Sequence, residues 1–298
     1  MEVFKGCAPA VVTPFNKNGK LNITEFKRLL DFQIKGGVNA VVVLGTTGEA
    51  STLSEQEKNA VAITALEYVN GKIPVIIGAG GNNTKEVLKR SKRFAKMGAD
   101  ALLQVTPYYN KATQKGLIEH FEKIANAANI PQILYNVPSR TGVNILPETV
   151  KTLSNHPNIV GIKEAGGNLA QLSELLRILP KHFAVYSGDD ENIFTTLALG
   201  GKGVISVVAN ILPKETSDIC WNFFEGNFKK SRELQFELTP IIKALFTEVN
   251  PIPVKAALNA MGFNVGAPRL PLTEISQENL NKLNYLLKKI NFSQQLRN

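Results

Sequence analysis

The chain of 298 residues has only two cysteines, Cys7 and Cys220, and three histidines. Two cysteines cannot build a disulfide framework, and so few thiols are typical of a protein from a reducing compartment. The histidines His120, His156 and His182 show none of the spacings by which zinc ligands are recognised. We therefore expect a fold that is held by its hydrophobic core and contains no metal site.

The sequence also lacks long apolar runs. Its most apolar stretches, 40–44 and 204–209, are far shorter than the roughly 20 residues that cross a bilayer. The first residues lack the charged and then apolar order of a secretory signal. We therefore expect a cytoplasmic protein without membrane contact. Hydrophobic residues make up 44% of the chain, which excludes a disordered chain and is enough for a large buried core.

Positive charge is in excess, with 34 lysines and arginines against 25 acids and a net charge of +9. A nucleic-acid binder is one interpretation, because basic surfaces attract phosphates. However, acids are interleaved with the basic residues, and basic runs such as Lys229-Lys230 and Lys288-Lys289 are only pairs. We therefore favour a basic enzyme without a nucleic-acid partner, whose positive field helps to gather small anions. A salt-dependent shift of DNA would instead support the nucleic-acid interpretation.

Short apolar runs alternate with helical stretches over the first two thirds of the chain. The runs are nearly continuous, as in strands that are covered on both faces. They lie at 7–12, 40–44, 75–78, 101–105, 132–136, 159–163, 183–187 and 203–207. Eight strand–helix units predict an α/β fold, the (β/α)8 TIM barrel. A doubly wound open sheet is the alternative, because periodicity does not reveal whether a sheet closes.

After about Glu225 the pattern becomes purely helical. Three helices are expected there, at 229–248, 251–261 and 275–290. We therefore divide the chain into a catalytic barrel, 1–225, and a small C-terminal helical region, 226–298.

Two helix starts carry a local signal. Asn22 with Glu25, and Ser54 with Glu57, have the spacing of capping boxes. In such a box the first side chain accepts a hydrogen bond from a backbone amide, and the acid reaches back to the first residue. Both pairs therefore predict the N-terminus of a helix.

The active site of such a barrel lies at the C-terminal ends of its strands. Hydroxyls, one arginine and one lysine follow the predicted strands at this end. These segments are Gly45-Thr-Thr-Gly-Glu49, Pro107-Tyr-Tyr-Asn110, Tyr135-Asn136 with Pro138-Ser-Arg-Thr-Gly142, Lys163, Gly188-Asp-Asp190 and Ser206. No phosphate-binding loop, dinucleotide fingerprint or serine-nucleophile motif is present, so a mechanism without a cofactor is the simplest interpretation.

Lys163 has the most informative position. It lies in a run, 159–164, with the pattern of a buried strand, where lysine is unfavourable without a reason. Desolvation lowers the pKa of a lysine, and the neutral amine can attack a carbonyl carbon. A lysine that pairs with Glu164 or closes a barrel end is an equally good interpretation of the pattern alone.

The other residues at the C-terminal ends of the predicted strands have less specific signals. Tyr135 and Tyr109 could relay protons, although a buried tyrosine with one hydrogen bond is the commoner case. Thr46 and Thr47 stand between glycines, so their amides can approach a carboxylate, but a bare turn is equally consistent. Arg140 lies between proline and glycine and suits bidentate capture of a carboxylate; otherwise it is a surface charge.

Taken together, these segments resemble the dihydrodipicolinate synthase / N-acetylneuraminate lyase family of class I aldolases over essentially the whole chain. Several ordered motifs at matching spacing make the resemblance specific. They are Gly45-Thr-Thr-Gly-Glu49, Tyr135-Asn-Val-Pro-Ser-Arg-Thr-Gly142, Gly161-Ile-Lys-Glu-Ala165, Ser187-Gly-Asp-Asp190, Gly203-Val-Ile-Ser-Val207, Asn250-Pro-Ile-Pro-Val-Lys255 and Arg269-Leu-Pro-Leu272.

The resemblance implies the condensation of pyruvate with L-aspartate-4-semialdehyde in diaminopimelate and lysine biosynthesis, with no external cofactor. Lys163 would form the Schiff base with pyruvate. Tyr135 would donate and accept protons, with Thr46 and Tyr109 completing the relay. In this family the tyrosine that matches Tyr109 comes from a neighbouring subunit, so the resemblance also implies a homo-oligomer, usually a tetramer built from two dimers.

Binding residues follow from the same resemblance. Thr47 and the backbone of Ile205 would hold pyruvate, with Gly188 lining the pocket, and Arg140 would bind the semialdehyde carboxylate. Sialic acid lyases resemble the chain in fold and lysine chemistry, but they usually have Gly-Ser-Thr-Gly-Glu and lack this arginine. Thr46 and Arg140 therefore favour the condensation over N-acetylneuraminate lyase or a keto-deoxy sugar acid aldolase, which remain the alternatives.

Lysine-inhibited members of the family bind lysine in a pocket at a subunit interface. The matching positions here are Ser51, Glu55, Lys58, Asn82, Glu86 and Tyr108. Asn82, Glu86 and Tyr108 agree with the family pattern. Glu55 and Lys58 stand where sensitive members typically have histidines, and a cationic Lys58 should repel the ammonium of the ligand. We therefore expect lysine inhibition to be weak or absent.

Overall fold

The computed structural model describes residues 2–295, and eight parallel strands form one sheet in the order β1-β8-β7-β6-β5-β4-β3-β2. The strands are β1 Gly6–Pro9, β2 Val41–Val43, β3 Val75–Gly78, β4 Ala101–Val105, β5 Gln132–Asn136, β6 Ile159–Glu164, β7 Ala184–Ser187 and β8 Gly203–Ser206. A parallel bridge between Ala10 and Val42 joins β1 to β2. The sheet therefore closes into a barrel, which confirms the predicted TIM fold and rules out the open doubly wound sheet.

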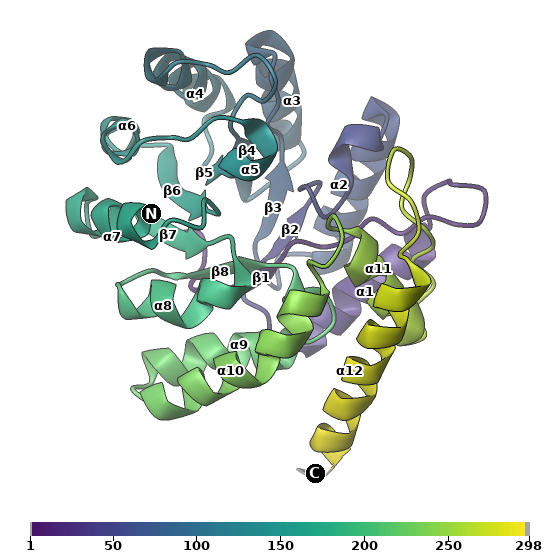
Figure 1. Ribbon diagram of the computed structural model, residues 1–298. Coiled ribbons are helices and arrows are strands. Elements are labelled where there is room, and N and C mark those ends of the chain that lie inside the picture. Colours follow the sequence, from purple (N-terminus) through teal and green to yellow (C-terminus); the bar gives the residue numbers. More distant parts are fainter. Residues whose placement is uncertain (1, 296–298) are drawn as a thin grey trace.

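Helices surround the barrel and cover the outer face of its strands (Figure 1). They are α1 Ile23–Lys35, α2 Glu55–Val69, α3 Thr84–Lys96, α4 Gln114–Ala128, α5 Pro138–Thr141, α6 Pro147–Leu153, α7 Leu169–Ile178, α8 Ile193–Ala198 and α9 Pro213–Phe224, with short 3₁₀ turns η1 Ala50–Thr52, η2 Asp190–Asn192 and η3 Val208–Asn210. Because both faces of the strands are covered, nearly all their residues are buried. This is why the strands have nearly continuous apolar sequences.

The interior of the barrel is a separate core cluster, built largely from small and β-branched residues such as Ala8, Val42 and Ala184. At its N-terminal end Phe4 stacks on Tyr186, with ring centroids 4.2 Å apart. The Tyr186 hydroxyl also donates a hydrogen bond of 2.7 Å to the Phe4 carbonyl oxygen. Phe4, which precedes β1, thus packs into the N-terminal end of the barrel. The polar residues that follow the strands lie at the opposite, C-terminal end.

Only one of the two predicted capping boxes is complete. At α2 the box is complete, because Ser54 Oγ accepts from the Glu57 amide and Glu57 Oε2 accepts from the Ser54 amide. At α1 Asn22 Oδ1 accepts from the Glu25 amide, but the prediction of a full box is wrong. The Asn22 amide donates to the Pro14 carbonyl, and the Glu25 carboxylate instead accepts from Arg28 and from a distant backbone amide.

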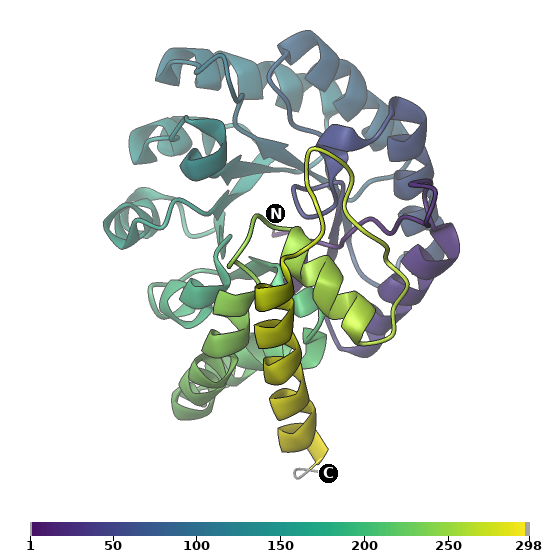
Figure 2. The same cartoon turned by 45° about the vertical axis from the view of Figure 1, so that its right-hand side comes forward.

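Three helices follow the barrel: α10 Phe228–Ala244, α11 Ile252–Ala260 and α12 Gln277–Gln295. One core cluster contains residues of the barrel strands, such as Val204, together with Leu234 of α10, Val254 of α11 and Leu283 of α12. In Figure 2, α11 and the loop after it lie in front of the barrel. The C-terminal helices are therefore packed directly onto the barrel. None of the described helices is long and apolar enough to cross a membrane.

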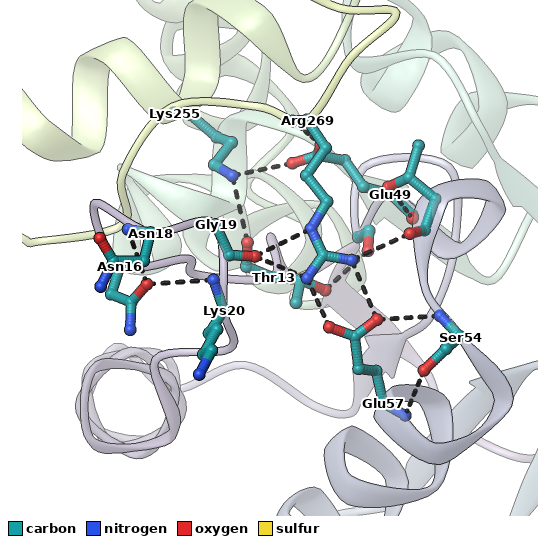
Figure 3. A network of polar contacts seen from close by, with 12 residues as sticks. Thr13, Asn16, Asn18, Gly19, Lys20, Glu49, Ser54, Glu57, Lys255 and Arg269 are labelled. Carbon is teal, nitrogen blue, oxygen red and sulfur yellow. Dashed lines mark hydrogen bonds and ion pairs between the residues drawn. The ribbon is translucent and has the colours of Figure 1, made fainter.

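An ionic cluster fastens the loop after α11 to the N-terminal half of the chain (Figure 3). The Arg269 guanidinium donates to both carboxylate oxygens of Glu57, at 2.5 and 2.9 Å, and to the carbonyl oxygens of Gly19 and Thr52. These hydrogen bonds from Arg269 lower the pKa of Glu57 to about 2, although partial burial opposes the shift. Glu57 thus serves both the α2 cap and this long-range contact.

We expect Glu57→Gln to destabilise the fold in a pH-dependent way. The lowered pKa means that the carboxylate contributes stability above the unfolded value of 4.5, and this contribution is lost as the pH falls toward 2. Glutamine can still serve the capping box, so the variant mainly removes the charge. Because the side chains of Glu57 and Arg269 are both partly exposed, the free energy of unfolding at pH 7 should fall by on the order of 1–2 kcal/mol, or about 2–4 °C in Tm.

Thermal unfolding of both proteins at pH 7, 5 and 3 and at one protein concentration measures this effect. The difference in Tm should narrow as the pH is lowered. The matched control is Glu278→Gln, since Glu278 pairs with Lys282 on the surface, and it should shift Tm much less. A difference in Tm that stays constant from pH 7 to pH 3 would contradict a stabilising role of the Glu57 charge.

Candidate active site

A cavity of about 420 Å³, called the rim cavity here, lies at the C-terminal ends of the strands. Six of the residues predicted from the sequence line it: Thr46, Thr47, Tyr135, Arg140, Lys163 and Gly188. They come from the loops or ends of β2, β5, β6 and β7. Parallel strands all end on the same side of the barrel, which is why residues so far apart in sequence surround one space.

Lys163 is buried, and it has no charged partner in the part of the chain that the structure describes. Its side chain is 5% exposed, and its ammonium lies 4.5 Å from the centroid of the Tyr135 ring. Within residues 2–295 the ammonium forms no hydrogen bond or ion pair. The register pairs Tyr135 of β5 directly with Lys163 of β6, so both side chains point to the same side of the sheet. A lysine in this position has its nitrogen available to a ligand in the cavity.

The alternative in which Lys163 pairs with Glu164 is wrong. Adjacent strand residues point to opposite faces, and the Glu164 carboxylate accepts from the Asn136 side chain, the Gly166 amide and Gln171. Burial raises the pKa of this carboxyl, although these hydrogen bonds oppose the shift. Asn136 and Gln171 also bind Asn144. Glu164 therefore connects the loops that follow β5 and β6.

Gly188 makes room for the lysine. A Cβ atom at this position would lie 2.9 Å from Lys163 Cε and 2.6 Å from the Cβ of Ala165. Any larger side chain would collide with the stem of Lys163. Gly188 therefore contributes space to the rim cavity, in agreement with its predicted place in the pocket wall.

The loop of Thr46 and Thr47 is tightly held. Thr47 is 2% exposed and its Oγ1 accepts a hydrogen bond of 3.0 Å from Asn250 Nδ2. The Gly48 carbonyl accepts a bond of 2.6 Å from the Thr13 hydroxyl. The loop therefore has little freedom to move, and a ligand in the cavity would meet it in a fixed arrangement.

Arg140 lies in the short helix α5, which begins with Pro138 and is capped after Thr141 by Gly142 in a left-handed conformation. Its guanidinium reaches the carbonyl oxygen of Asn250 at 3.3 Å. Asn250 thus contacts both Thr47 and Arg140, and it lines the cavity itself. In the sequence Asn250 stands out only as part of a motif, and no role is predicted for it. Its contacts with residues 203 and 110 positions away carry no local sequence signal.

Two predicted residues lie outside the rim cavity. Tyr109 is 91% exposed and has a positive φ of 73°, so within one chain it points into solvent. Ile205 is fully buried in the cluster inside the barrel, and the cavity wall contains its neighbour Val207 instead.

A second cavity of about 270 Å³, called the side cavity here, shares Thr46 and Tyr135 with the rim cavity. Three of the predicted regulatory positions line it, Ser51, Lys58 and Tyr108. The other three do not: Glu55, Asn82 and Glu86 lie outside its wall. The two cavities are therefore neighbours, and both reach the same two hydroxyl-bearing residues.

The surroundings of the side cavity are rich in positive charge. Lys58, Arg90 and Arg93 all form ion pairs with Glu55. Burial alone would raise the pKa of Glu55, but the hydrogen bonds from Arg93 and Lys58 lower it to about 2. Arg90 also lines the cavity and donates to the carbonyl oxygens of Ala79 and Gly80. Neither arginine was predicted from the sequence; the two lie one helical turn apart on α3.

No metal site emerges from the side chains of the described residues, since none of their histidine, cysteine and acidic side chains form a group of three or more that could hold an ion. The rim residues instead offer one amine, several hydroxyls and one guanidinium. This set can form an imine with a carbonyl compound, move protons and bind a carboxylate.

Comparisons with known proteins agree with this chemistry. The model of the dihydrodipicolinate synthetase family matches residues 3–290. The 4-hydroxy-tetrahydrodipicolinate synthase of Alkaliphilus oremlandii is 52% identical over 289 residues, which cover 97% of this chain and 99% of that protein. A crystal structure of dihydrodipicolinate synthase from Thermotoga maritima has a TM-score of 0.95 and 47% identity, covering 97% of this chain and 99% of the other. A structure described as the first monomeric dihydrodipicolinate synthase variant has a TM-score of 0.94 and 47% identity, covering 96% of each chain.

Proposed function

The chain belongs to the dihydrodipicolinate synthetase family of enzymes, and we propose that it condenses pyruvate with L-aspartate-4-semialdehyde in diaminopimelate and lysine biosynthesis. This is the reaction of a 4-hydroxy-tetrahydrodipicolinate synthase. The observation that carries the proposal is the unpaired, buried ammonium of Lys163 beside Tyr135 in the rim cavity.

The reaction begins when the Lys163 amine attacks the keto carbon of pyruvate and water leaves, which forms an iminium. The iminium withdraws electrons, so the pyruvate methyl group loses a proton and an enamine results. The enamine carbon attacks the aldehyde carbon of the second substrate, whose oxygen takes up a proton. The amino group of that substrate then adds to the imine carbon and displaces Lys163, which closes the ring.

Tyr135 is placed to handle the protons of these steps. Its side chain lines the cavity and its ring faces the Lys163 ammonium, so its hydroxyl can give and take protons near the imine. Thr46 would connect Tyr135 to Tyr109 of a neighbouring subunit. Support for this arrangement comes from Tyr109 itself, a large aromatic side chain that is almost fully exposed in the single chain.

The binding roles follow the same arrangement. Thr47 and the backbone near Ile205 would hold the pyruvate carboxylate, with Gly188 leaving space for the imine. Arg140 would bind the carboxylate of the semialdehyde. The assembly would be a homotetramer of two dimers acting on small molecules in the cytoplasm. No external cofactor is needed, because the lysine imine itself serves as the electron sink.

Borohydride trapping tests the role of Lys163. Incubation with pyruvate and borohydride should give one reduced pyruvate adduct per chain, and peptide mapping should locate it on Lys163. Lys163→Met should give no adduct while keeping its circular dichroism spectrum. The buried Lys255 is an internal control, because it does not line the cavity and should stay unmodified. A folded wild-type protein without an adduct at saturating pyruvate would refute the proposed function.

Arg140→Ala should weaken binding of the semialdehyde selectively. Loss of a charge-assisted contact with a carboxylate costs about 1.5–3 kcal/mol, which corresponds to a rise in KM of roughly 10–150-fold. The KM for pyruvate should change much less, because pyruvate is held at Lys163. Steady-state kinetics with each substrate varied separately measure both values, with Arg140→Lys as the charge-preserving control.

A panel of substrates distinguishes the alternatives. Turnover of sialic acid or keto-deoxy sugar acids, unaffected by Arg140→Ala, would instead support N-acetylneuraminate lyase or a sugar acid aldolase.

Free lysine should inhibit turnover weakly or not at all. Lys58 and Arg90 line the side cavity, and Arg93 adds a third positive charge near it, so a ligand ammonium would meet repulsion there. Turnover should be nearly unchanged in millimolar lysine. Lys58→Gln should raise the sensitivity to lysine if charge is the cause. Strong inhibition of the wild-type enzyme would contradict the prediction.

A further inference from the structure

A second buried lysine, Lys255 of α11, differs sharply from Lys163. It is 1% exposed, and its ammonium donates to Glu49 Oε1 at 2.8 Å and to the carbonyl oxygens of Thr13 and Ala267 at 3.2 and 3.0 Å. These acceptors use all three protons of the ammonium. Figure 3 shows it directed at Glu49 and Thr13. Lys255 does not line the rim cavity, so its role must be exerted through its partners.

The principal partner, Glu49, ends the Gly45–Glu49 loop that carries Thr46 and Thr47. Its backbone has a φ of 52°, in the left-handed region, and Leu44 on the other side of the loop has a φ of 58°. A residue with a Cβ atom is strained in this conformation, because the Cβ crowds the following carbonyl oxygen. The loop is therefore bounded by two non-glycine residues in a conformation that needs support from the rest of the structure.

The carboxylate of Glu49 receives that support from the C-terminal part of the chain. One oxygen binds Lys255, and the other accepts a hydrogen bond of 2.8 Å from the backbone amide of Arg269. Glu49 is 3% exposed, so water does not compete for these contacts. Both anchors are more than 200 residues from Glu49 in sequence, and the ion pair is almost fully shielded from solvent.

We propose that Lys255 is a positioning residue for the reaction. By holding the Glu49 carboxylate, it keeps Glu49 in its left-handed conformation and so fixes the loop that presents Thr46 and Thr47 to the rim cavity. The inference rests on the proposed function, because it assigns Lys255 an effect on the pyruvate side of that reaction. Lys255 itself does not touch the substrate.

The same ionic cluster provides a matched control. Glu57 and the Arg269 guanidinium form its other half, in which the guanidinium donates to Gly19 and Thr52 but not to the Glu49 carboxylate. Glu57→Gln breaks an ion pair of the cluster. It keeps both contacts of the Glu49 carboxylate, the hydrogen bond from the Arg269 backbone amide and the ion pair with Lys255. This variant should lose stability without losing turnover.

The choice of variant at Lys255 depends on the cost of an unpaired buried charge. Lys255→Met alone leaves the Glu49 carboxylate without its cation, and breaking a buried pair in this way commonly prevents folding. The double variant Glu49→Gln/Lys255→Met removes both charges and leaves none unpaired, so it should fold. The side-chain oxygen of the glutamine can still accept a hydrogen bond from the Arg269 amide, but the ion pair with Lys255 is lost.

The experiment compares wild type, Glu57→Gln and the double variant well below the Tm of each. We expect kcat of the double variant to fall at least about tenfold and its KM for pyruvate to rise, with borohydride trapping of pyruvate slowed in parallel. Its KM for the semialdehyde should change less than about threefold, because Arg140 lies on another loop. Glu57→Gln should match wild type in all four values.

A folded double variant with wild-type kcat and pyruvate KM would overturn the inference. So would an equal loss of turnover in Glu57→Gln, since that would show a general effect of stability. Failure of the proposed function is seen separately, because in that case wild-type protein itself neither traps pyruvate nor turns over.

Discussion

Lys163 has a buried ammonium without a counter-ion among the described residues, and the rim cavity is arranged around this constraint. Such a group is unfavourable in a protein interior, so its neighbours must leave it room and a compatible surface. Gly188 supplies the room, since a Cβ there would reach Lys163 Cε. Tyr135 supplies the face of an aromatic ring. The nearest carboxylate in sequence, Glu164, points to the other face of the sheet and is engaged by amides. The amine therefore remains available for covalent chemistry.

The two buried lysines show how surroundings decide between chemistry and structure. The ammonium of Lys255 has three acceptors, one of them a carboxylate, whereas that of Lys163 has none among the described residues. The same side chain thus has the surroundings of an anchor in one place, and in the other those of the nucleophile that we propose. The anchor lies in α11, and the loop between α10 and α11 carries Asn250, which contacts Thr47 and Arg140. These helices therefore complete the rim of the barrel in addition to covering its outside.

The sequence was sufficient for the barrel, because strands covered on both faces leave continuous apolar runs, and for the rim residues, because parallel strands end on one side. It was insufficient wherever a contact joins distant segments. The predicted box at Asn22 failed because Glu25 binds the amide of Asn264, and nothing local signals that choice. Asn250 and Arg93 were missed for the same reason. The exposure of Tyr109 was equally inaccessible from the sequence, since a tyrosine beside a strand end has the same pattern whether it faces solvent or the cavity.

The distribution of charge links the two cavities. The rim cavity has Arg140 and Lys163 in its wall, and the side cavity, which shares Thr46 and Tyr135 with it, has Lys58 and Arg90. Glu55 is the partner of Lys58, Arg90 and Arg93, so this group keeps an excess of positive charge. Pyruvate is an anion, and a positive field in a low-dielectric cleft concentrates anions. Free lysine has a net positive charge, so we expect the same field to disfavour it. The semialdehyde has one carboxylate and one ammonium, so its net charge is zero and its proposed recognition depends on the local contact with Arg140.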